Sequence, residues 1–297
     1  MNKDIKISVV ITTKDRVDFL IRCIESIFSS SLLPDEIIIV NDGGCEIKNN
    51  IFNDNSVFID VINNKFSYGG NKARNQGIKA SSGDILFFLD DDDAYTSESI
   101  SERIKLFEDP DVVLAFTGVK FVNSNNLGLI LREKKAFSEN ITYKKLLSQG
   151  NLIGSTSCVS VRRSAIFSAG LFDENVIALQ DYETWLRISK LGKIVHDNQS
   201  NLIYTLHVGN NQISSKYERY LNAGEYIFNK YKKDLISYNI YNDFLSQRYL
   251  RVAISASSTS ESIKYKYALK SLKHKFNVQA CALLLPTKIL KKFKDFT

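Results

Sequence analysis

The feature that most constrains the fold is an apolar run that ends in four consecutive aspartates. Residues 85–89 read Ile-Leu-Phe-Phe-Leu, and Asp90–Asp93 follow directly. A continuous apolar run of this length is typical of a strand buried on both faces of a parallel sheet. Four adjacent carboxylates repel one another unless a cation lies between them. Because ligands bind at the carboxyl ends of parallel strands, the sequence predicts a divalent cation here, held by carboxylate oxygens and carrying substrate phosphates.

The first ninety residues alternate between strand-like and helix-like segments. Apolar, often β-branched runs occupy residues 5–12, 36–40 and 57–62. Between the first two runs, apolar residues from 17 to 28 recur at the spacing of an amphipathic helix. This alternation predicts βαβ units in a parallel sheet. The extended segments between 112 and 132 predict added mixed or antiparallel strands.

The chain changes character near residue 215. Its 297 residues suffice for one large domain with an appendage, and beyond residue 215 strand-like runs become sparse. Nine lysines against two acids give residues 261–297 a charge of +7, so the net charge of +6 leaves −1 for the rest of the chain. We therefore predict an α/β domain at 1–215 and a basic helical C-terminal extension at 216–297.

Cysteine use and hydropathy favour a cytoplasmic protein. The four cysteines are scattered and form no Cys-x-x-Cys pair, which favours free thiols in a reducing compartment. The N-terminus lacks the charged and apolar regions of a signal peptide. No apolar run approaches the roughly 18 residues that a transmembrane helix needs. We therefore expect cytoplasmic localisation.

The basic extension leaves two interpretations open. Lysines interleaved with apolar residues over 261–297 suit peripheral contact with an anionic membrane, here the inner membrane, where each lysine contributes on the order of 1 kcal/mol. The other interpretation is a solvated helical appendage packed on the main domain. No nucleic-acid partner is expected, because the extension has neither a groove-binding motif nor ordered aromatic platforms.

Several motifs between residues 5 and 215 occur in an order that resembles the family 2 glycosyltransferases. They are Val9–Arg16, Val40–Gly44, Gly70–Ile78, Phe88–Asp93 and Leu179–Arg187, followed by Tyr204–His207. The resemblance implies a GT-A fold, a Rossmann-like mixed and mostly parallel sheet flanked by helices. It also implies inverting transfer of a sugar from a nucleotide-sugar donor, with a UDP-sugar favoured, to a hydroxyl of a glycan or lipid-linked glycan. Bacterial surface polysaccharide synthesis, of the O-antigen or capsule type, is the expected setting.

The resemblance places a Mn²⁺ or Mg²⁺ ion at the acidic run. Asp90, Asp91 and Asp92 match the family's Asp-x-Asp motif, so Asp90 and Asp91 are expected at the donor and Asp92 on the metal. The register could instead be Asp91 and Asp93, and an acidic loop that caps the next helix is a further alternative. His207 matches a histidine that approaches the metal or the diphosphate, although a histidine in a strand can also be structural. Such an ion stabilises negative charge on a leaving diphosphate.

Besides Asp90 and Asp91, five more residues are expected to contact the nucleotide sugar. Asp42 matches an aspartate that accepts a hydrogen bond from the base, and a turn or helix-capping role is its alternative. Thr13, Asp15 and Arg16 lie where the family lines the nucleotide pocket, although Arg16 could instead form a surface ion pair. Arg74 matches a donor-contacting arginine whose planar guanidinium suits a diphosphate. Its alternative is a structural salt bridge.

An inverting transfer needs a base that takes the proton of the acceptor hydroxyl. Asp181 matches the family's base, and Gln180 replaces the acid that commonly precedes it. The alternative is that Asp181 only caps its helix. Two other functions remain open. A catalytically silent glycan-binding scaffold would show a damaged acidic motif, and a sugar nucleotidyltransferase would need a glycine-rich loop where Thr12–Arg16 has no glycine.

Overall fold

The computed structural model describes residues 5–48, 57–136, 139–207 and 216–290. The chain forms two compact units. The first contains residues 1–141, 153–174 and 184–208, and the second contains residues 142–152, 175–183 and 209–297. The second unit therefore includes two segments from earlier in the chain, and the domain division at residue 215 stays a prediction.

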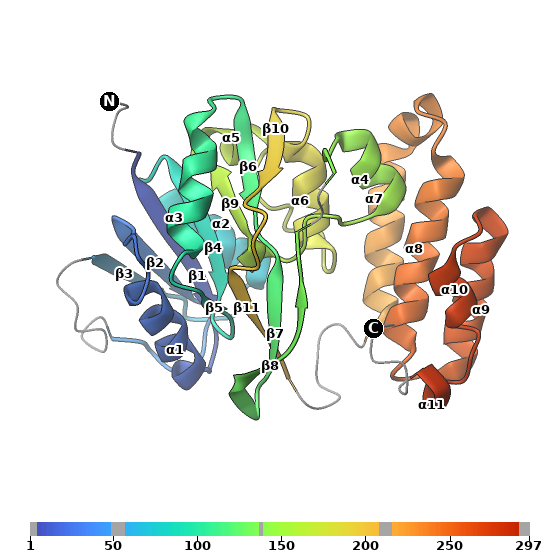
Figure 1. Cartoon of the computed structure of the whole chain (residues 1–297), viewed down its shortest axis with the longest axis horizontal. Coiled ribbons are helices and arrows are strands. Elements are labelled where there is room, and N and C mark those ends of the chain that lie inside the picture. The colour runs from blue at the N-terminus through green and yellow to red at the C-terminus, as the bar shows by residue number, and fades with distance from the viewer. Residues whose placement is uncertain (1–4, 49–56, 137–138, 208–215, 291–297) are drawn as a thin grey trace. The chain divides into compact units, whose positions relative to one another are not determined.

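The first unit is built on a seven-stranded sheet (Figure 1). Its strands are β1 (Ile7–Thr13), β2 (Glu36–Asn41), β3 (Phe58–Asn63), β4 (Ile85–Asp90), β6 (Val112–Phe116), β9 (Val159–Arg162) and β10 (Lys193–His196). They lie in the order β10-β6-β9-β4-β1-β2-β3. Strand β9 is antiparallel to both of its neighbours, and the other neighbouring pairs are parallel. The predicted mixed, mostly parallel sheet is confirmed.

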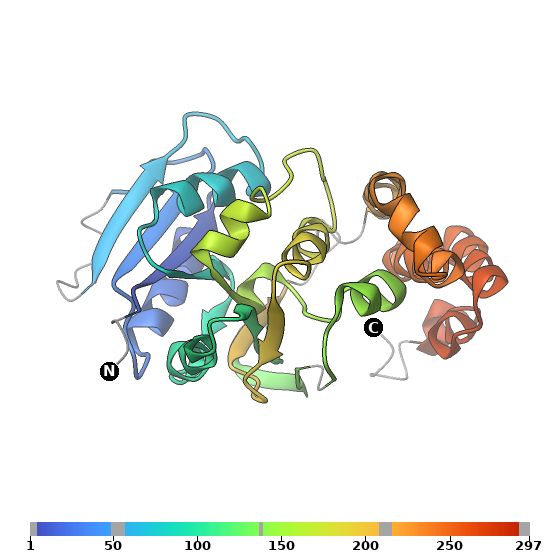
Figure 2. The same ribbon diagram turned by 90° about the horizontal axis from the view of Figure 1, so that it is seen from above.

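Helices cover both faces of this sheet. They include α1 (Val17–Phe28), α2 (Gly70–Ala80), α3 (Ser99–Lys105) and α5 (Arg163–Ser168). Figure 2 shows α2 and α5 on one face and α1 and α3 on the other. Helix α2 lies very close to the sheet at Gly77, where an added Cβ would be 2.5 Å from Cγ1 of Val10. Because Gly77 lacks a side chain, α2 can pack against β1 and β2 and carry Arg74 toward the end of β4.

A buried carboxylate ties together the N-terminal ends of three central strands. Glu36 opens β2 and is 8% exposed. Its Oε1 accepts hydrogen bonds from Ser8 Oγ in β1 at 2.6 Å and from the Ser82 N–H, just before β4, at 2.5 Å. Burial alone would raise the pKa of Glu36, but the bonds from Ser8, Ser82 and Gly83 outweigh burial and lower it. Ionised Glu36 therefore fixes β1, β2 and β4 at the sheet edge opposite the one where Asp90–Asp93 follow β4.

A smaller sheet follows the acidic run. Its strands are β5 (Ala94–Tyr95), β7 (Val119–Asn123), β8 (Asn126–Lys134) and β11 (Leu202–Leu206), and their order is β5-β11-β7-β8. Strand β11 is antiparallel to β5 and parallel to β7. The extended segments predicted between 112 and 132 are therefore β6, β7 and β8. Because β5 begins one residue after Asp93, the pairing of β5 with β11 brings a distant segment beside the aspartates.

The second unit is helical, which confirms the predicted helical C-terminus. It contains α4 (Tyr143–Gln149), α7 (Tyr217–Ser237), α8 (Tyr241–Ala256), α9 (Glu261–His274), α10 (Val278–Ala282), α11 (Thr287–Leu290) and the first turn of α6 (Gln180–Ile188). Its core includes Tyr220, Leu250, Val252 and Tyr267. No helix in the described ranges combines the length and apolarity needed to cross a membrane.

A buried ion pair connects α6 to α7 within this unit. Glu183 is fully buried and accepts a hydrogen bond from the Tyr231 hydroxyl at 2.9 Å. Lys230 Nζ lies 2.7 Å from the same carboxylate oxygen. The first turn of α6, which carries Asp181, is therefore held by side chains of α7.

Candidate active site

The acidic run lies where the central strands end together. Thr13, the last residue of β1, is in register with Asn41, the last residue of β2. Thr12 is in register with Asp90, the last residue of β4. Because β1, β2 and β4 are parallel, their carboxyl ends meet at one edge of the sheet, which is where ligands bind to open α/β sheets.

The four aspartates divide into a buried pair and an accessible pair. Asp91 and Asp93 are 0% and 1% exposed, whereas the side chains of Asp90 and Asp92 are 28% and 19% exposed. Burial raises the pKa of Asp91 to about 6, against the opposing effect of the Arg16 charge. Burial, and the charges of Asp92 and Asp90, raise the pKa of Asp93 well above its ordinary value. The accessible carboxylates are therefore those of the Asp90 and Asp92 register.

Asp91 anchors the segment that follows β1. Its Oδ2 accepts a hydrogen bond from Thr13 Oγ1 at 2.7 Å, and its Oδ1 lies 2.5 Å from Arg16 Nη2. The other terminal nitrogen of Arg16, Nη1, is 2.6 Å from Asp92 Oδ2. Thr13 and Arg16, both predicted to line the donor pocket, are thus brought to the aspartates, and the Arg16 side chain stays 41% exposed.

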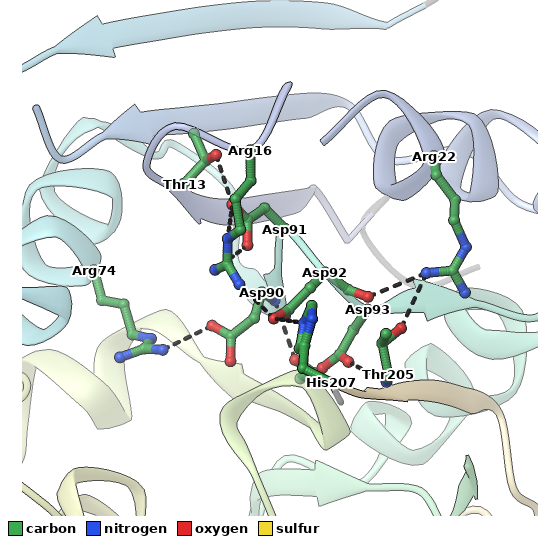
Figure 3. Close-up of polar contacts among 11 residues, drawn as sticks. Thr13, Arg16, Arg22, Arg74, Asp90, Asp91, Asp92, Asp93, Thr205 and His207 are labelled. Atoms are coloured by element: carbon green, nitrogen blue, oxygen red, sulfur yellow. Dashed lines mark hydrogen bonds and ion pairs between the residues drawn. The ribbon is translucent and has the colours of Figure 1, made fainter. Parts of the chain in front are cut away.

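Asp92 and His207 form the central pair of the site (Figure 3). His207 Nε2 lies 2.9 Å from Asp92 Oδ2. His207 directly follows the last residue of β11, and the ring of Phe19 in α1 meets its imidazole edge-on at a centroid distance of 5.2 Å. Two residues separated by 115 positions in the sequence therefore meet at the sheet edge.

Arg74 binds the other accessible carboxylate. Its Nη2 is 2.7 Å from Asp90 Oδ1, and its guanidinium lies over the ring of Phe172, 5.8 Å from the centroid. The main-chain N–H of Asp90 donates to Ser157 Oγ at 3.1 Å. This salt bridge corresponds to the structural alternative for Arg74, and it also places a permanent positive charge at the site.

Asp42 and Asp15 organise the loops beside the aspartates. Asp42 Oδ2 accepts hydrogen bonds from Ser67 Oγ and the Gly69 N–H, each at 2.8 Å, and its Oδ1 accepts from the Tyr68 N–H at 2.8 Å. Asp15 Oδ1 accepts from the Cys45 N–H at 3.2 Å. The bonds of Asp42 are those of its turn-forming alternative, so a nucleotide base would be an additional partner.

A hollow opens beside these loops. It has a volume of about 490 Å³, and it is lined by Asp15, Arg16, Val17, Asp18, Phe19 and Cys45. Glycine is required at its rim, because Gly44 has φ of +99° and an added Cβ would lie 2.1 Å from Asp15 Oδ1. The hollow lies within the range of small-molecule sites, about 300–1,000 Å³.

The Asp92–His207 contact fits a divalent cation. Neighbouring ligands of an octahedral ion with bonds of about 2.1 Å lie about 3 Å apart, and the two side-chain atoms are 2.9 Å apart. In the part of the chain that the structure describes, no group of three or more His, Cys, Asp or Glu side chains is arranged to hold a metal. If a divalent cation binds here, Asp92 and His207 would be its side-chain ligands, and water and substrate phosphates would occupy the other positions, as is usual for Mg²⁺.

Asp181 lies in the second unit, in the first turn of α6. Its Oδ2 accepts a hydrogen bond from Asn151 Nδ2 at 3.0 Å, and its Oδ1 accepts from the Tyr182 N–H at 2.8 Å. The second of these bonds satisfies one of the free N–H groups at the helix start, in keeping with the capping alternative. The side chain is partly exposed, so it stays accessible to solvent while both of its oxygens are oriented.

Sequence reasoning missed three residues of this arrangement. Arg22 and Thr205 bind the acidic segment, and Asn151 binds Asp181. Arg22 lies within an otherwise regular amphipathic pattern, and Thr205 lies within a short, mostly apolar strand, so neither stands out in a single sequence. Their partners are far away in the sequence, so local patterns could not reveal them.

Curated relatives share much of this chain. An uncharacterized glycosyltransferase of Bacillus subtilis, YwdF, is 31% identical over 73% of this chain and 81% of its own length. AmsE of Erwinia amylovora, an amylovoran biosynthesis glycosyltransferase, is 23% identical over 68% of this chain and 76% of its own length. WcaA of Escherichia coli, named for colanic acid biosynthesis, is 26% identical over 77% of this chain and 81% of its own length. The match covers only 27% of a longer Rickettsia bellii glycosyltransferase.

Solved structures share the fold. S. aureus TarS, residues 1–349, in complex with UDP-GlcNAc has a TM-score of 0.60 at 16% identity, over 97% of this chain and 91% of that one. The mannosyltransferase PcManGT of Pyrobaculum calidifontis, in complex with GDP-Man and Mn²⁺, has a TM-score of 0.62 at 13% identity, over 99% and 83%. These likenesses confirm the predicted GT-A fold.

The family model of glycosyl transferase family 2 matches residues 8–167, from the second residue of β1 through β9, and this range includes the whole acidic run. The match, together with the named relatives, favours a glycosyltransferase over a nucleotidyltransferase and over a silent scaffold. The chain belongs to glycosyltransferase family 2.

Proposed function

We propose that this glycosyltransferase moves a sugar, with inversion, from a UDP-sugar to a hydroxyl of a glycan or lipid-linked glycan during synthesis of a bacterial surface polysaccharide. The observation that carries the proposal is the 2.9 Å contact between Asp92 and His207 at the carboxyl edge of the sheet. The relatives named for amylovoran and colanic acid biosynthesis support the polysaccharide setting. The TarS complex supports UDP as the carrier, whereas the PcManGT complex makes GDP the rival.

We assign the metal ligands to Asp92 and His207, with Mn²⁺ or Mg²⁺ as the ion. A carboxylate oxygen suits Mn²⁺ or Mg²⁺, and the PcManGT complex contains Mn²⁺. When bound, such an ion stabilises the charge that gathers on the leaving diphosphate. Its binding competes with Arg16 for Asp92 Oδ2, because Arg16 Nη1 is 2.6 Å from that oxygen.

The donor site is assigned to Thr13, Asp15, Arg16, Asp42, Arg74, Asp90 and Asp91. Arg16 and Arg74 supply positive charge beside the accessible carboxylates, where a diphosphate can accept their hydrogen bonds. Asp15 lines the hollow, and Asp42 holds the adjoining loop 67–69. Thr13 and Asp91 act indirectly, because Asp91, held by Thr13, fixes the direction of the Arg16 side chain.

Asp181 is our proposed base. Asn151 and the Tyr182 N–H each donate to one of its oxygens, so the ionised carboxylate is held in one orientation. An oriented carboxylate can accept the proton of the acceptor hydroxyl as that oxygen attacks the anomeric carbon. The proton passes to Asp181, and the bond between the sugar and the diphosphate breaks.

Donor turnover with separate binding measurements tests these roles. Purified protein is incubated with UDP-GlcNAc, other UDP-sugars and GDP-Man, and release of the nucleoside diphosphate is measured with Mn²⁺ or with EDTA. Asp181→Asn should lower turnover by about 10²–10⁴-fold and leave UDP binding unchanged, whereas Asp92→Asn should lower both. Asp109→Asn, an exposed aspartate paired with Lys193, is the matched control. No turnover with any donor, or full turnover by Asp181→Asn, would contradict the assignment. Inversion is tested separately, from the anomeric coupling of the product in NMR.

We also propose peripheral contact between the basic extension and an anionic membrane. Lys266, Lys270 and Lys273 lie exposed on the outward face of α9 with Leu269, and Phe276 just beyond the helix is 73% exposed. Cationic side chains beside exposed apolar groups suit a surface of anionic lipid. Replacing the three lysines by Gln should weaken co-sedimentation with vesicles that contain phosphatidylserine by about 100-fold, at about 1 kcal/mol for each lysine. Equal sedimentation with neutral phosphatidylcholine vesicles would contradict the proposal.

A further inference from the structure

Arg22 reaches the candidate metal site from the middle of α1. Its Nη1 donates to the main-chain oxygen of Asp92 at 3.1 Å and to Thr205 Oγ1 at 3.1 Å (Figure 3). Neither Arg22 nor Thr205 is among the residues assigned to the donor or the metal. A single nitrogen atom therefore joins the acidic segment to β11.

Thr205 is held from a second side. Its N–H donates to Asp93 Oδ1 at 3.0 Å, and Asp93 is 1% exposed. Two residues earlier in β11, Ile203 pairs with Ala94 of β5. The end of β11 is thus attached to residues 92–94 by a side chain, a main-chain group and a strand pairing.

These attachments determine where His207 lies. Residues two apart in an extended segment point to the same side, so fixing Thr205 fixes the side on which His207 leaves β11. His207 Nε2 then lies 2.9 Å from Asp92 Oδ2. Because Arg22 is held by the main-chain oxygen of Asp92 while it donates to the side chain of Thr205, it fixes the end of β11, and with it His207, relative to Asp92.

We propose that Arg22 is a positioning residue for the Asp92–His207 pair. It acts through Thr205 and is not itself one of the proposed metal ligands or donor-binding residues. The inference rests on the proposed role of that pair as metal ligands. Partners that orient metal ligands typically change metal affinity by 10–100-fold when they are removed, and loss of Arg22 should have an effect in that range.

The test measures Mn²⁺ affinity. Mn²⁺ is titrated into protein saturated with UDP, and electron paramagnetic resonance reports the free Mn²⁺. Arg22→Met keeps most of the aliphatic stem and removes the donors, and we expect a Mn²⁺ Kd raised 10–100-fold. Thr205→Val removes only the hydroxyl acceptor and should also raise the Kd, whereas Thr205→Ser should restore it. Arg162→Met is the matched control, because Arg162 also donates to main-chain oxygens, of Val112 and Phe107, away from the aspartates.

A double-mutant cycle shows whether Arg22 acts through His207. In a His207→Ala background, Arg22→Met should change the Mn²⁺ Kd by less than about 2-fold, because neighbours that act together are not additive. An equal effect with and without His207, or wild-type affinity in both Arg22→Met and Thr205→Val, would overturn the inference. If Arg22→Met does not fold, Thr205→Val with Thr205→Ser decides. Failure of the proposed function looks different, since Asp92→Asn and His207→Ala would then bind Mn²⁺ like the wild type.

Discussion

Glu36 offers a quantitative test of how the sheet presents the site. Its Oε1 accepts four hydrogen bonds, from Ser8 Oγ at 2.6 Å, the Ser82 N–H at 2.5 Å, Ser82 Oγ at 3.1 Å and the Gly83 N–H at 3.3 Å. Glu36→Gln keeps the shape and an acceptor oxygen but removes the charge. Hydrogen bonds to a charged group contribute about 1 kcal/mol more than neutral ones. With two short bonds affected, we expect the free energy of unfolding to fall by about 2 kcal/mol at pH 7.

The effect should depend on pH in a defined direction. The pKa of Glu36 is lowered in the folded protein, so its stabilising contribution is present above the unfolded value of about 4.3 and is lost as pH falls through the folded value. The difference between wild type and Glu36→Gln should therefore be largest at neutral pH and shrink below about pH 4.

Urea unfolding of both proteins at pH 7 and near pH 3.5 measures these differences. Glu102→Gln, at a partly exposed glutamate of α3, is the matched control and should change stability by less than about 0.5 kcal/mol. Equal stability of wild type and Glu36→Gln at pH 7 would refute the reasoning, as would a difference that grows on acidification.

Three further substitutions or modifications test other parts of the structure. Gly77→Ala places a Cβ 2.5 Å from Val10 Cγ1 and should lower the free energy of unfolding, measured in urea, by about 1–3 kcal/mol. Its control is Gly128→Ala, where the added Cβ would lie 3.8 Å from its nearest neighbour, and this change should be nearly neutral. Tyr231→Phe removes the hydroxyl that donates to buried Glu183 and should cost about 1–3 kcal/mol, with Tyr241→Phe at an exposed tyrosine as control; unchanged unfolding would argue against the ion-pair network. Cys45 lines the hollow and is exposed, whereas Cys23 and Cys158 are buried. UDP with Mn²⁺ should therefore slow alkylation of Cys45 in a mass-spectrometric time course. An unaffected rate would show that the hollow is not part of the donor site.

The sequence predicts the central strands well because burial on both faces leaves a direct pattern. Strands β1, β2 and β4 each contain a run of apolar residues, and each is buried along most of its length. The direction of β9 was not predictable. Its four residues pair antiparallel between β4 and β6, and that orientation depends on long-range pairing rather than on a local pattern.

The candidate site was predictable in composition but not in its contacts. The sequence alone left two registers open for the aspartates, and the structure shows that the register of Asp90 and Asp92 is the accessible one. Asp42 shows the limit of motif matching, because both of its oxygens are engaged by residues 67–69. Arg22 could not be identified, because its role arises from a bond to a strand 183 residues away.

The most direct test of the central proposal is calorimetric titration of the protein with UDP and with GDP, each with Mn²⁺ and with EDTA, for wild type, Asp92→Asn and the Asp109→Asn control. The account predicts that UDP binds tightly only with Mn²⁺, that Asp92→Asn weakens this binding at least 10-fold, and that the control binds like wild type. Tight binding of GDP alone would reassign the donor. Nucleotide affinity that is the same with Mn²⁺, with EDTA and in Asp92→Asn would contradict a metal-assisted donor site at the aspartates.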